Sequence, residues 1–187
     1  MTDRHPFLLD STLCQTENLM NKIAWGDRMK EIPYRRADAV QYARRWALKR
    51  NANYYNFEYI GGDCTNFASQ CLFAGAGTMN YTPTYGWYYR SLSDRSPAWS
   101  GVKYLYNFLV NNKSAGPYGH VVSQKNAEPG DLVQLGKSDG HFYHTSVITE
   151  VSPVILVCAH SYDAVDRPLY SYDYEAIRFL HIDGARK

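Results

Sequence analysis

Gly61-Gly62-Asp63-Cys64-Thr65-Asn66-Phe67-Ala68-Ser69-Gln70-Cys71-Leu72 is the stretch that decides the fold. It joins a flexible glycine turn to apolar residues that recur at positions i, i+3, i+4, i+7 and i+8, counted from Cys64. This spacing is typical of a helix with one buried face. A glycine commonly follows the end of a helix, so we expect this one to stop near Gly75 or Gly77.

The residue types at the start of this helix indicate nucleophilic chemistry. Asp63 is a good N-cap residue, because its carboxylate can accept hydrogen bonds from first-turn amides. Cys64 then faces the positive end of the helix dipole, which favours thiolate over thiol. A thiolate is the nucleophile of cysteine hydrolases, and the same free amides can hold an oxyanion. The alternative interpretation is an inert, buried cysteine.

Length and charge limit the classes of protein to consider. A chain of 187 residues predicts a single domain over residues 1–187, in which residues 1–30 carry little pattern beyond a short helix around 18–30. The net charge of +2 and the lack of a basic run predict no nucleic-acid or membrane partner, and we expect a monomer. The first ten residues hold only three consecutive apolar residues, too few for a signal peptide. We therefore expect a cytoplasmic protein, or one released by a route without a signal.

The cysteines do not form a metal or disulfide pattern. The chain has four, Cys14, Cys64, Cys71 and Cys158, without the paired spacing of a zinc ribbon. Two turns of helix separate Cys64 from Cys71, roughly 10 Å by helical rise, which is too far for a disulfide. Cys71 and Cys158 lie in apolar contexts, so we expect them in the core.

The rest of the chain places helices before strands. Apolar periodicity predicts helices over residues 36–49 and 102–110, the second capped by Ser100. Strands are predicted over residues 132–135, 144–151, 154–160 and 177–182. Helices followed by antiparallel strands indicate an α+β domain. Residues 78–100 are rich in aromatic residues and are either a loop that packs its rings on the core or an aromatic wall beside the active site.

Two histidines fall where a general base is needed. If residues 151–153 form a three-residue hairpin loop, His144 lies directly opposite His160 on the neighbouring strand and points to the same face. A two-residue loop would send the two rings to opposite faces. In the first register His144 is the base for Cys64, and His160 orients its ring. Asp163 or Asp166 could be the orienting residue instead.

Other candidate roles are weaker. A zinc site of His141, His144 and His160 is disfavoured, because the first two are three residues apart at a strand start and face apart. Tyr54, or one of its neighbours Tyr55 and Tyr59, could donate a second hydrogen bond to an oxyanion. No metal or organic cofactor is expected.

These residues carry a resemblance to a known family. The chain resembles the bacterial putative amidase domain family over roughly residues 33–170, with the specific core Asp63-Cys64-Thr65-Asn66-Phe67. Further matching segments are residues 39–43 with Trp46, 51–57, 61–72, 87–89, Trp99, 130–134 and His144. The family often has proline where this chain has Ala52, a change that would only make the connector less stiff.

The resemblance implies a fold and a mechanism. The family is similar to the CHAP and NlpC-type cell-wall hydrolases, which share a papain-like fold and a Cys-His pair with a third polar residue. That trio maps onto Cys64, His144 and His160. In NlpC-type enzymes the aspartate before the cysteine binds a free amine and an upstream tyrosine lines the oxyanion site, which implies substrate-binding roles for Asp63 and Tyr54.

The prediction from sequence is therefore a cysteine hydrolase that cuts an amide bond. Peptidoglycan is the expected substrate, at the muramoyl–alanine amide or a stem-peptide bond. One alternative is a papain-like module that binds a peptide or glycan without turnover. Another is an acyltransferase that uses the same cysteine and histidine but passes the acyl group to an amine.

Overall fold

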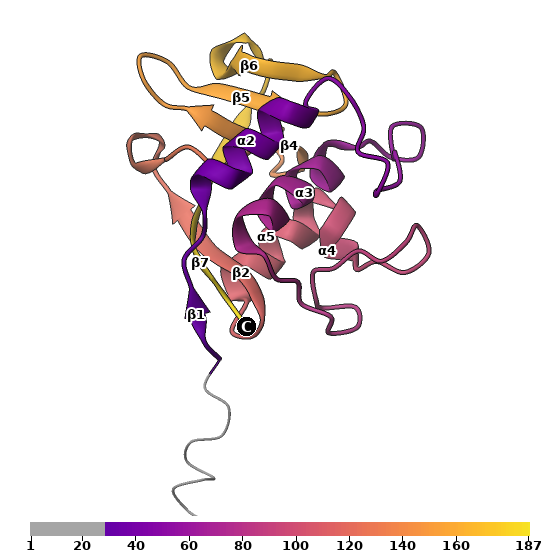
Figure 1. Cartoon of the computed structure of the whole chain (residues 1–187). Helices are drawn as coiled ribbons and strands as arrows, with labels where there is room; N and C mark the ends of the chain where they lie inside the picture. The colour runs from indigo at the N-terminus through magenta and orange to yellow at the C-terminus, as the bar shows by residue number, and fades with distance from the viewer. Residues whose placement is uncertain (1–28) are drawn as a thin grey trace, which may run out of the picture.

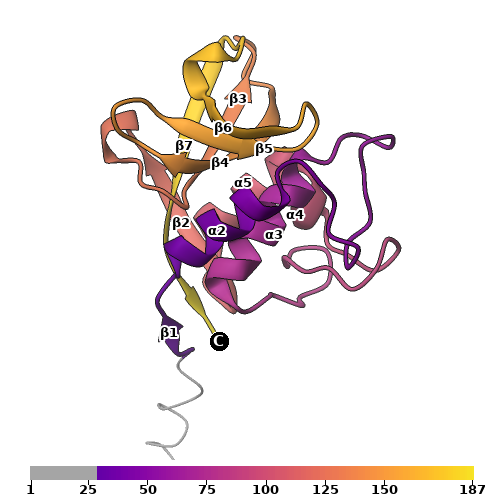
Figure 2. The ribbon, with the colours of Figure 1, turned by 45° about the horizontal axis from the view of Figure 1, so that its top comes forward.

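An antiparallel sheet forms one layer of the fold, and helices cover one of its faces (Figures 1 and 2). The computed structural model describes residues 29–187. Within them the helices are α2 (Arg36–Trp46), α3 (Cys64–Ala76), α4 (Pro97–Ser100) and α5 (Val102–Asn111). The strands are β1 (Glu31–Ile32), β2 (Gly116–Val122), β3 (Leu132–Gly136), β4 (Phe142–Glu150), β5 (Leu156–Ala159), β6 (Ala164–Pro168) and β7 (Ala176–Arg186). The α+β prediction with an antiparallel sheet is confirmed.

The longest strand, β7, connects the two parts of the sheet. The strand order is β1-β7-β3-β4-β5-β6, and β2 pairs with β7 as well. Every one of these pairs is antiparallel. Residues 161–163 belong to the turn that connects β5 to β6, and Ser161 contacts Asp63 just before α3. The segment around Cys64 and the end of β5 therefore approach each other at one end of the sheet.

Most predicted elements are present with small shifts in their ends. The helices predicted over residues 36–49 and 102–110 are present as α2 and α5. The helix predicted from Cys64 to near Gly75 or Gly77 is α3, and Gly77 ends it in the left-handed region at φ 66°. The Ser100 cap is wrong, because Ser100 ends α4 and Gly101 precedes α5. Strands β2 and β6 were not predicted from sequence. The helix predicted around residues 18–30 lies almost wholly outside the described residues, as does Cys14.

The expected one-sided burial of α3 is wrong. Eleven of its 13 residues are buried, including polar residues on the face away from the apolar stripe. These polar side chains are paired: Trp99 donates its indole N–H to Asn66, and Trp87 donates to Ser69, at 2.8 and 2.9 Å. Thus α3 is a central helix whose polar face is hydrogen-bonded to the aromatic segment that follows it.

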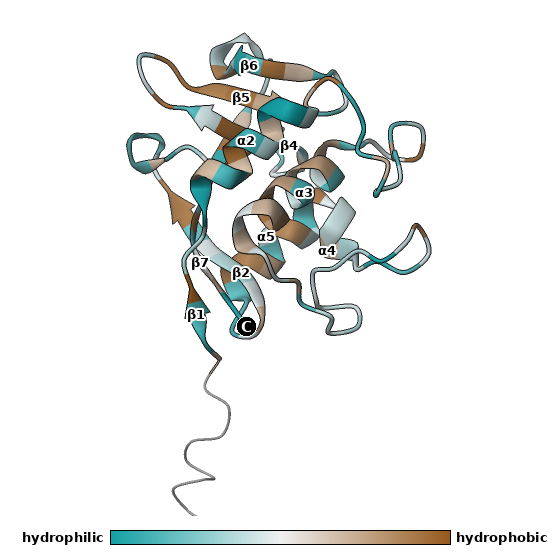
Figure 3. Cartoon of the chain, in the orientation of Figure 1, coloured by the Kyte–Doolittle hydropathy of each residue, from teal (hydrophilic) through white to brown (hydrophobic). Residues whose placement is uncertain are grey.

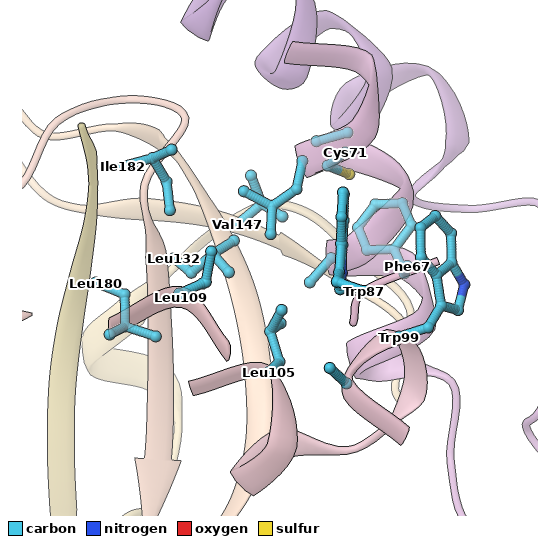
Figure 4. Packing of buried hydrophobic residues seen from close by; sticks show 14 of the residues in the cluster. Phe67, Cys71, Trp87, Trp99, Leu105, Leu109, Leu132, Val147, Leu180 and Ile182 are labelled. Carbon is cyan, nitrogen blue, oxygen red and sulfur yellow. The ribbon is translucent and has the colours of Figure 1, made fainter. Parts of the chain in front are cut away.

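Two apolar clusters lie on the two faces of the sheet. The larger lies between the helices and the sheet and includes Phe67, Trp87, Trp99 and Val147 (Figure 4). In the smaller cluster, Val133 and neighbouring strand residues contact apolar side chains of residues 169–177. Figure 3 shows the corresponding apolar colour along α3, α5 and the strands. Trp87 and Trp99 are fully buried, so residues 78–100 pack aromatic rings on the core as one of the two interpretations predicts.

The predicted register of the β4–β5 hairpin is wrong. Glu150 pairs with Leu156, so five residues connect the strands, and a register shift then aligns Val147 with Cys158. The paired stretch ends there, so His144 and His160 are not opposite each other in the sheet. His160 instead follows Cys158 on the face toward the helices. A slip of one residue sends a side chain to the other face of a sheet, which separates the two histidines.

No helix among residues 29–187 is long and apolar enough to cross a bilayer.

Candidate active site

A cavity of about 360 Å³ opens at the end of the sheet where β4 begins. Cys64 and His144 both line it, and they come from the first residue of α3 and the start of β4. The remaining wall comes from the turn before α3, the turn after β5, and the segment around β6 and Tyr172. The structure thus brings together the predicted nucleophile and the predicted base, whereas His160, Asp63 and Tyr54 are not among the lining residues.

Short contacts hold Cys64 against β4. The backbone of Thr145, the residue after His144, hydrogen-bonds the Cys64 sulfur. The hydroxyls of Thr65 and Thr145 lie 3.3 Å apart, which joins the first turn of α3 to the same point of β4. The Cys64 thiol is nearly buried, with 7 % of the residue exposed. These contacts fix the sulfur beside the chain segment that carries His144.

The expected low pKa of Cys64 is reversed. Burial raises the pKa of the Cys64 thiol above its ordinary value, and hydrogen bonds from Thr145 and Thr65 offset this only in part. The nearby Asp63 carboxylate raises it further. Burial of the sulfur, the largest of these effects, therefore works against a preformed thiolate at the start of α3.

His144 is also buried as a neutral ring. Burial lowers the pKa of His144 to about 4, and the positive charge of Arg167 lowers it in the same direction. Its ring stacks on Tyr172 with centroids 5.8 Å apart. Its Nε2 atom is buried and has no hydrogen-bond partner among the described residues. At neutral pH the free site therefore holds a neutral imidazole and a thiol in one cavity, so His144 is able to accept a proton.

His160 does not orient His144. Its Nδ1 atom lies 2.5 Å from the Asp63 carboxylate and its Nε2 atom 2.9 Å from the backbone carbonyl of Trp46. A carbonyl only accepts, so Nε2 donates to Trp46. The ring also stacks on Phe67 at 4.0 Å. His160 is thus a buried support beneath the start of α3.

The Asp63 carboxylate bonds to other residues of the protein and does not face the cavity. Its carboxylate accepts from the Phe57 amide at 2.9 Å and from the Asn66 side chain at 2.8 Å, besides its contact with His160. It makes no side-chain cap to α3, so the capping prediction is wrong. With 1 % of the residue exposed and its oxygens occupied, Asp63 holds the turn before Cys64.

The other predicted site residues also bind elsewhere. Asp163 forms a two-pronged ion pair with Arg50, with distances of 2.8 and 2.9 Å. Asp166 accepts from Arg44 and from Thr149. Neither aspartate reaches His144, so neither is its orienting residue. Among residues 29–187 no group of three His, Cys, Asp or Glu side chains is arranged to hold a metal ion.

Tyr54 packs in an aromatic stack away from the cavity. Its ring lies on Trp99 at 5.6 Å between centroids and contacts Tyr89 at 5.2 Å. Burial raises the pKa of its phenol. The structure therefore places Tyr54 in the core-packing group and gives it no contact with the cavity.

Two turns with positive φ angles shape the entrance beside Cys64. Gly61 and Gly62 have φ of 110° and 93°, and Ser161 and Tyr162 have φ of 58° and 75°. The Ser161 hydroxyl accepts from the Asp63 amide at 2.8 Å, and a Cβ on Gly62 would lie 3.3 Å from that hydroxyl. Non-glycine residues rarely adopt this backbone region, and such strain often occurs at functional sites.

Sequence reasoning missed one side of the cavity. Arg167 and Tyr172 face His144, and Tyr143 donates its hydroxyl to the Asp173 carbonyl at 3.0 Å, which holds this segment over the site. No motif or spacing marks these residues, because β6 is a short strand and residues 169–175 have no regular period.

Comparisons with known proteins identify a family and two relatives. The profile of the putative amidase domain family matches residues 33–182, which include Cys64 and His144. Two Bacillus subtilis (strain 168) proteins are similar, and both carry names that leave their roles open. The uncharacterized protein YhbB is 35 % identical over 149 residues, which cover 77 % of this chain and 46 % of YhbB. The uncharacterized protein YjcM is 30 % identical over 141 residues, which cover 70 % of this chain and 31 % of YjcM.

The chain spans less than half the length of these two relatives. No solved structure matches it. The family name indicates amide hydrolysis, and the profile covers the whole described site. By this match, the chain belongs to the putative amidase domain family.

Proposed function

We propose that the protein is a cysteine hydrolase that cleaves amide bonds, with Cys64 as nucleophile and His144 as general base and acid. The observation that supports this proposal is that the two side chains, from separate elements, line one cavity of about 360 Å³. A cavity of this size is at the lower end of the range for small-molecule sites, about 300–1,000 Å³.

The reaction begins from the neutral pair. His144 takes the thiol proton as the Cys64 sulfur attacks the amide carbonyl, so a carbon–sulfur bond forms. The first-turn amides of α3 have no acceptor within the helix and can donate to the oxyanion. His144 then gives its proton to the leaving amine as the carbon–nitrogen bond breaks. Water, deprotonated by His144, hydrolyses the thioester and restores the thiol.

The closed surroundings of His144 suit this double role. A base whose pKa is lowered to about 4 is neutral at pH 7 and ready to accept a proton, although it is a weak base. Its partner, a thiol whose pKa is raised by burial, ionises only as the proton is transferred. The pair therefore works through concerted proton transfer more than through a preformed thiolate.

A papain-like arrangement and a peptidoglycan substrate are part of the proposal. The Cys64 helix packs on an antiparallel sheet that carries the base, which is the arrangement expected from the resemblance to CHAP and NlpC-type hydrolases. The substrate would be the muramoyl–alanine amide or a stem-peptide bond. The proposed partner is therefore peptidoglycan or another peptide-like amide, and a single chain suffices for the reaction.

The test is product analysis with matched cysteine variants. Wild-type protein, Cys64→Ala and Cys71→Ala are incubated with purified peptidoglycan and with synthetic muramyl peptides, and products are identified by mass spectrometry. Cys71 lies on the same helix and is fully buried, so its variant controls for loss of a thiol from α3. We expect cleavage by wild type and Cys71→Ala and none by Cys64→Ala.

Two results would replace this proposal. Binding of the muramyl peptide without cleavage, by wild type as by Cys64→Ala, would favour the binding module. Products joined to an added amine would favour acyl transfer by the same pair. Cleavage by Cys64→Ala at the wild-type rate would refute Cys64 as the nucleophile.

A further inference from the structure

We propose that Arg167 forms a carboxylate-binding subsite in the Cys64–His144 cavity, so that the preferred substrates are amides with a free carboxylate close to the scissile bond. The inference rests on the proposed function and names the substrate class of the same site. Arg167 is the one basic residue among those that line the cavity with Cys64 and His144.

The strand register directs Arg167 into the site. On β6 it pairs with Val157, which lies in the apolar cluster under residues 169–177. Opposite residues of an antiparallel pair point to the same face, so Arg167 is directed to the face that carries His144. The preceding Asp166 has φ 46° and is held on the other face by Arg44 and Thr149. These contacts fix the direction in which Arg167 leaves the strand.

The guanidinium is positioned without being neutralised. Its Nε and Nη2 atoms donate to the hydroxyl and carbonyl of Ser171 at 2.8 and 2.9 Å, and its Cζ lies 4.1 Å from the Tyr172 ring centroid. Within the described part of the chain it has no carboxylate within 4.0 Å, in contrast to Arg44 and Arg50. The charge is therefore oriented by neutral partners and stays available to an anion.

The chemistry of the fork favours a carboxylate. A guanidinium has five N–H donors in one plane, and the two bonds to Ser171 leave donors at Nη1 and on Nη2. A planar carboxylate can accept two such bonds side by side. Because Arg167 and Cys64 line the same cavity of about 360 Å³, a carboxylate on Arg167 shares that cavity with the carbonyl that Cys64 attacks.

Two alkylating reagents test this subsite at Cys64. Iodoacetate and iodoacetamide differ in one group, a carboxylate against a neutral amide. In both reactions the sulfur forms a bond to the methylene carbon, and iodide leaves with the electrons of the carbon–iodine bond. Rates at Cys64 are measured by mass spectrometry at pH 8.5 and divided by the rates for N-acetylcysteine. The ratio of the two normalised rates reports attraction of the carboxylate alone.

We expect iodoacetate to be favoured about tenfold in the wild type, as one charged hydrogen bond provides at a partly exposed site. Arg167→Gln should reduce the ratio to about one, whereas Arg167→Lys should keep part of it. Arg45→Gln is the matched control, because Arg45 is exposed and does not line the cavity. Loss of the Arg167 charge also changes His144, but this affects both reagents and cancels in the ratio. Equal ratios in the wild type and Arg167→Gln would overturn the proposal.

A second measurement does not depend on the reactivity of Cys64. Acetate and acetamide are titrated into the ¹⁵N-labelled protein, and the Nε–H resonance of Arg167 is assigned by its loss in Arg167→Gln. A saturable shift with acetate, absent with acetamide, supports the subsite, and no shift overturns it. If Cys64 reacts with neither reagent while acetate binds, the proposed mechanism fails and the carboxylate site stands.

Discussion

Buried His144 makes the stability of the fold depend on pH in a window that can be calculated. The ring has a pKa of about 4 in the folded protein and of about 6.5 in an unfolded chain. Between these values the unfolded state binds more protons, so the free energy of unfolding falls as pH falls. Its contribution is complete above pH 6.5 and is lost by pH 4.

The magnitude follows from the size of the shift. Each pKa unit corresponds to about 1.4 kcal/mol, so a fall from about 6.5 to about 4 sets a limit of about 3.4 kcal/mol. Between pH 7 and pH 4, where the folded ring is half protonated, the loss is about 3 kcal/mol. Only 8 % of His144 is exposed, so little solvent screening reduces this value.

The assay is a double difference between two proteins and two pH values. Urea unfolding of the wild type and His144→Asn is followed by tryptophan fluorescence at pH 7 and pH 4. Carboxylates that titrate over the same range act on both proteins and cancel. We expect the wild type to lose about 3 kcal/mol more than the variant. His141→Asn, which removes an exposed ring from the turn before β4, is the control and should give a much smaller difference.

A double difference below about 1 kcal/mol, with equal denaturant slopes, would refute the reasoning. It would mean that His144 is charged or solvated in the folded protein. The neutral pair from which the reaction begins would then be wrong, whatever the activity of the enzyme.

Three further outcomes follow from the same contacts. The acid side of the kcat/KM profile should be half-maximal near pH 4, since neutral His144 is the proposed base. A midpoint near pH 6.5 would contradict this. Asp63→Ala should lower the free energy of unfolding, measured in urea, by about 3–5 kcal/mol, because it leaves His160 buried without its carboxylate partner. A loss of under about 1 kcal/mol would exclude a structural role for the pair. Trp87→Phe should lower the melting temperature by about 3 °C, because it removes a hydrogen bond to Ser69 that contributes about 1 kcal/mol. An unchanged melting temperature would count against that bond.

Local patterns were enough to predict the helix that carries the proposed nucleophile. The apolar stripe from Cys64 and the later Gly77 fix the bounds of α3, because a helix depends on neighbours three and four residues apart. What the pattern could not show is that Asn66 and Ser69 are buried too. Their partners, Trp99 and Trp87, are distant in sequence, and only the folded chain brings the donors to them.

The position of His160 could not be predicted, because it depends on a register. The five-residue connection and the shift between Ile148 and Glu150 move the pairing, and a change of one residue reverses a side chain. The spacing of His144 and His160 in the sequence allows the two rings to lie on the same face of the sheet or on opposite faces. Arg167 was missed for a related reason. It lies on β6, an edge strand too short to show a period, and its direction depends on its pairing with Val157 of β5.

His160 nevertheless acts on the site without touching His144. The Asp63 carboxylate raises the pKa of the Cys64 thiol, so its negative charge works against ionisation of the nucleophile. The same carboxylate lies 2.5 Å from Nδ1 of His160 and 3.6 Å from the Arg50 guanidinium, so it is paired within the protein. Without them, a bare carboxylate beside the sulfur would make proton transfer to His144 harder. The groups paired with Asp63 therefore fix the turn before Cys64 and limit the negative field at its sulfur, and the neutral pair in the cavity is the proposed site of proton transfer.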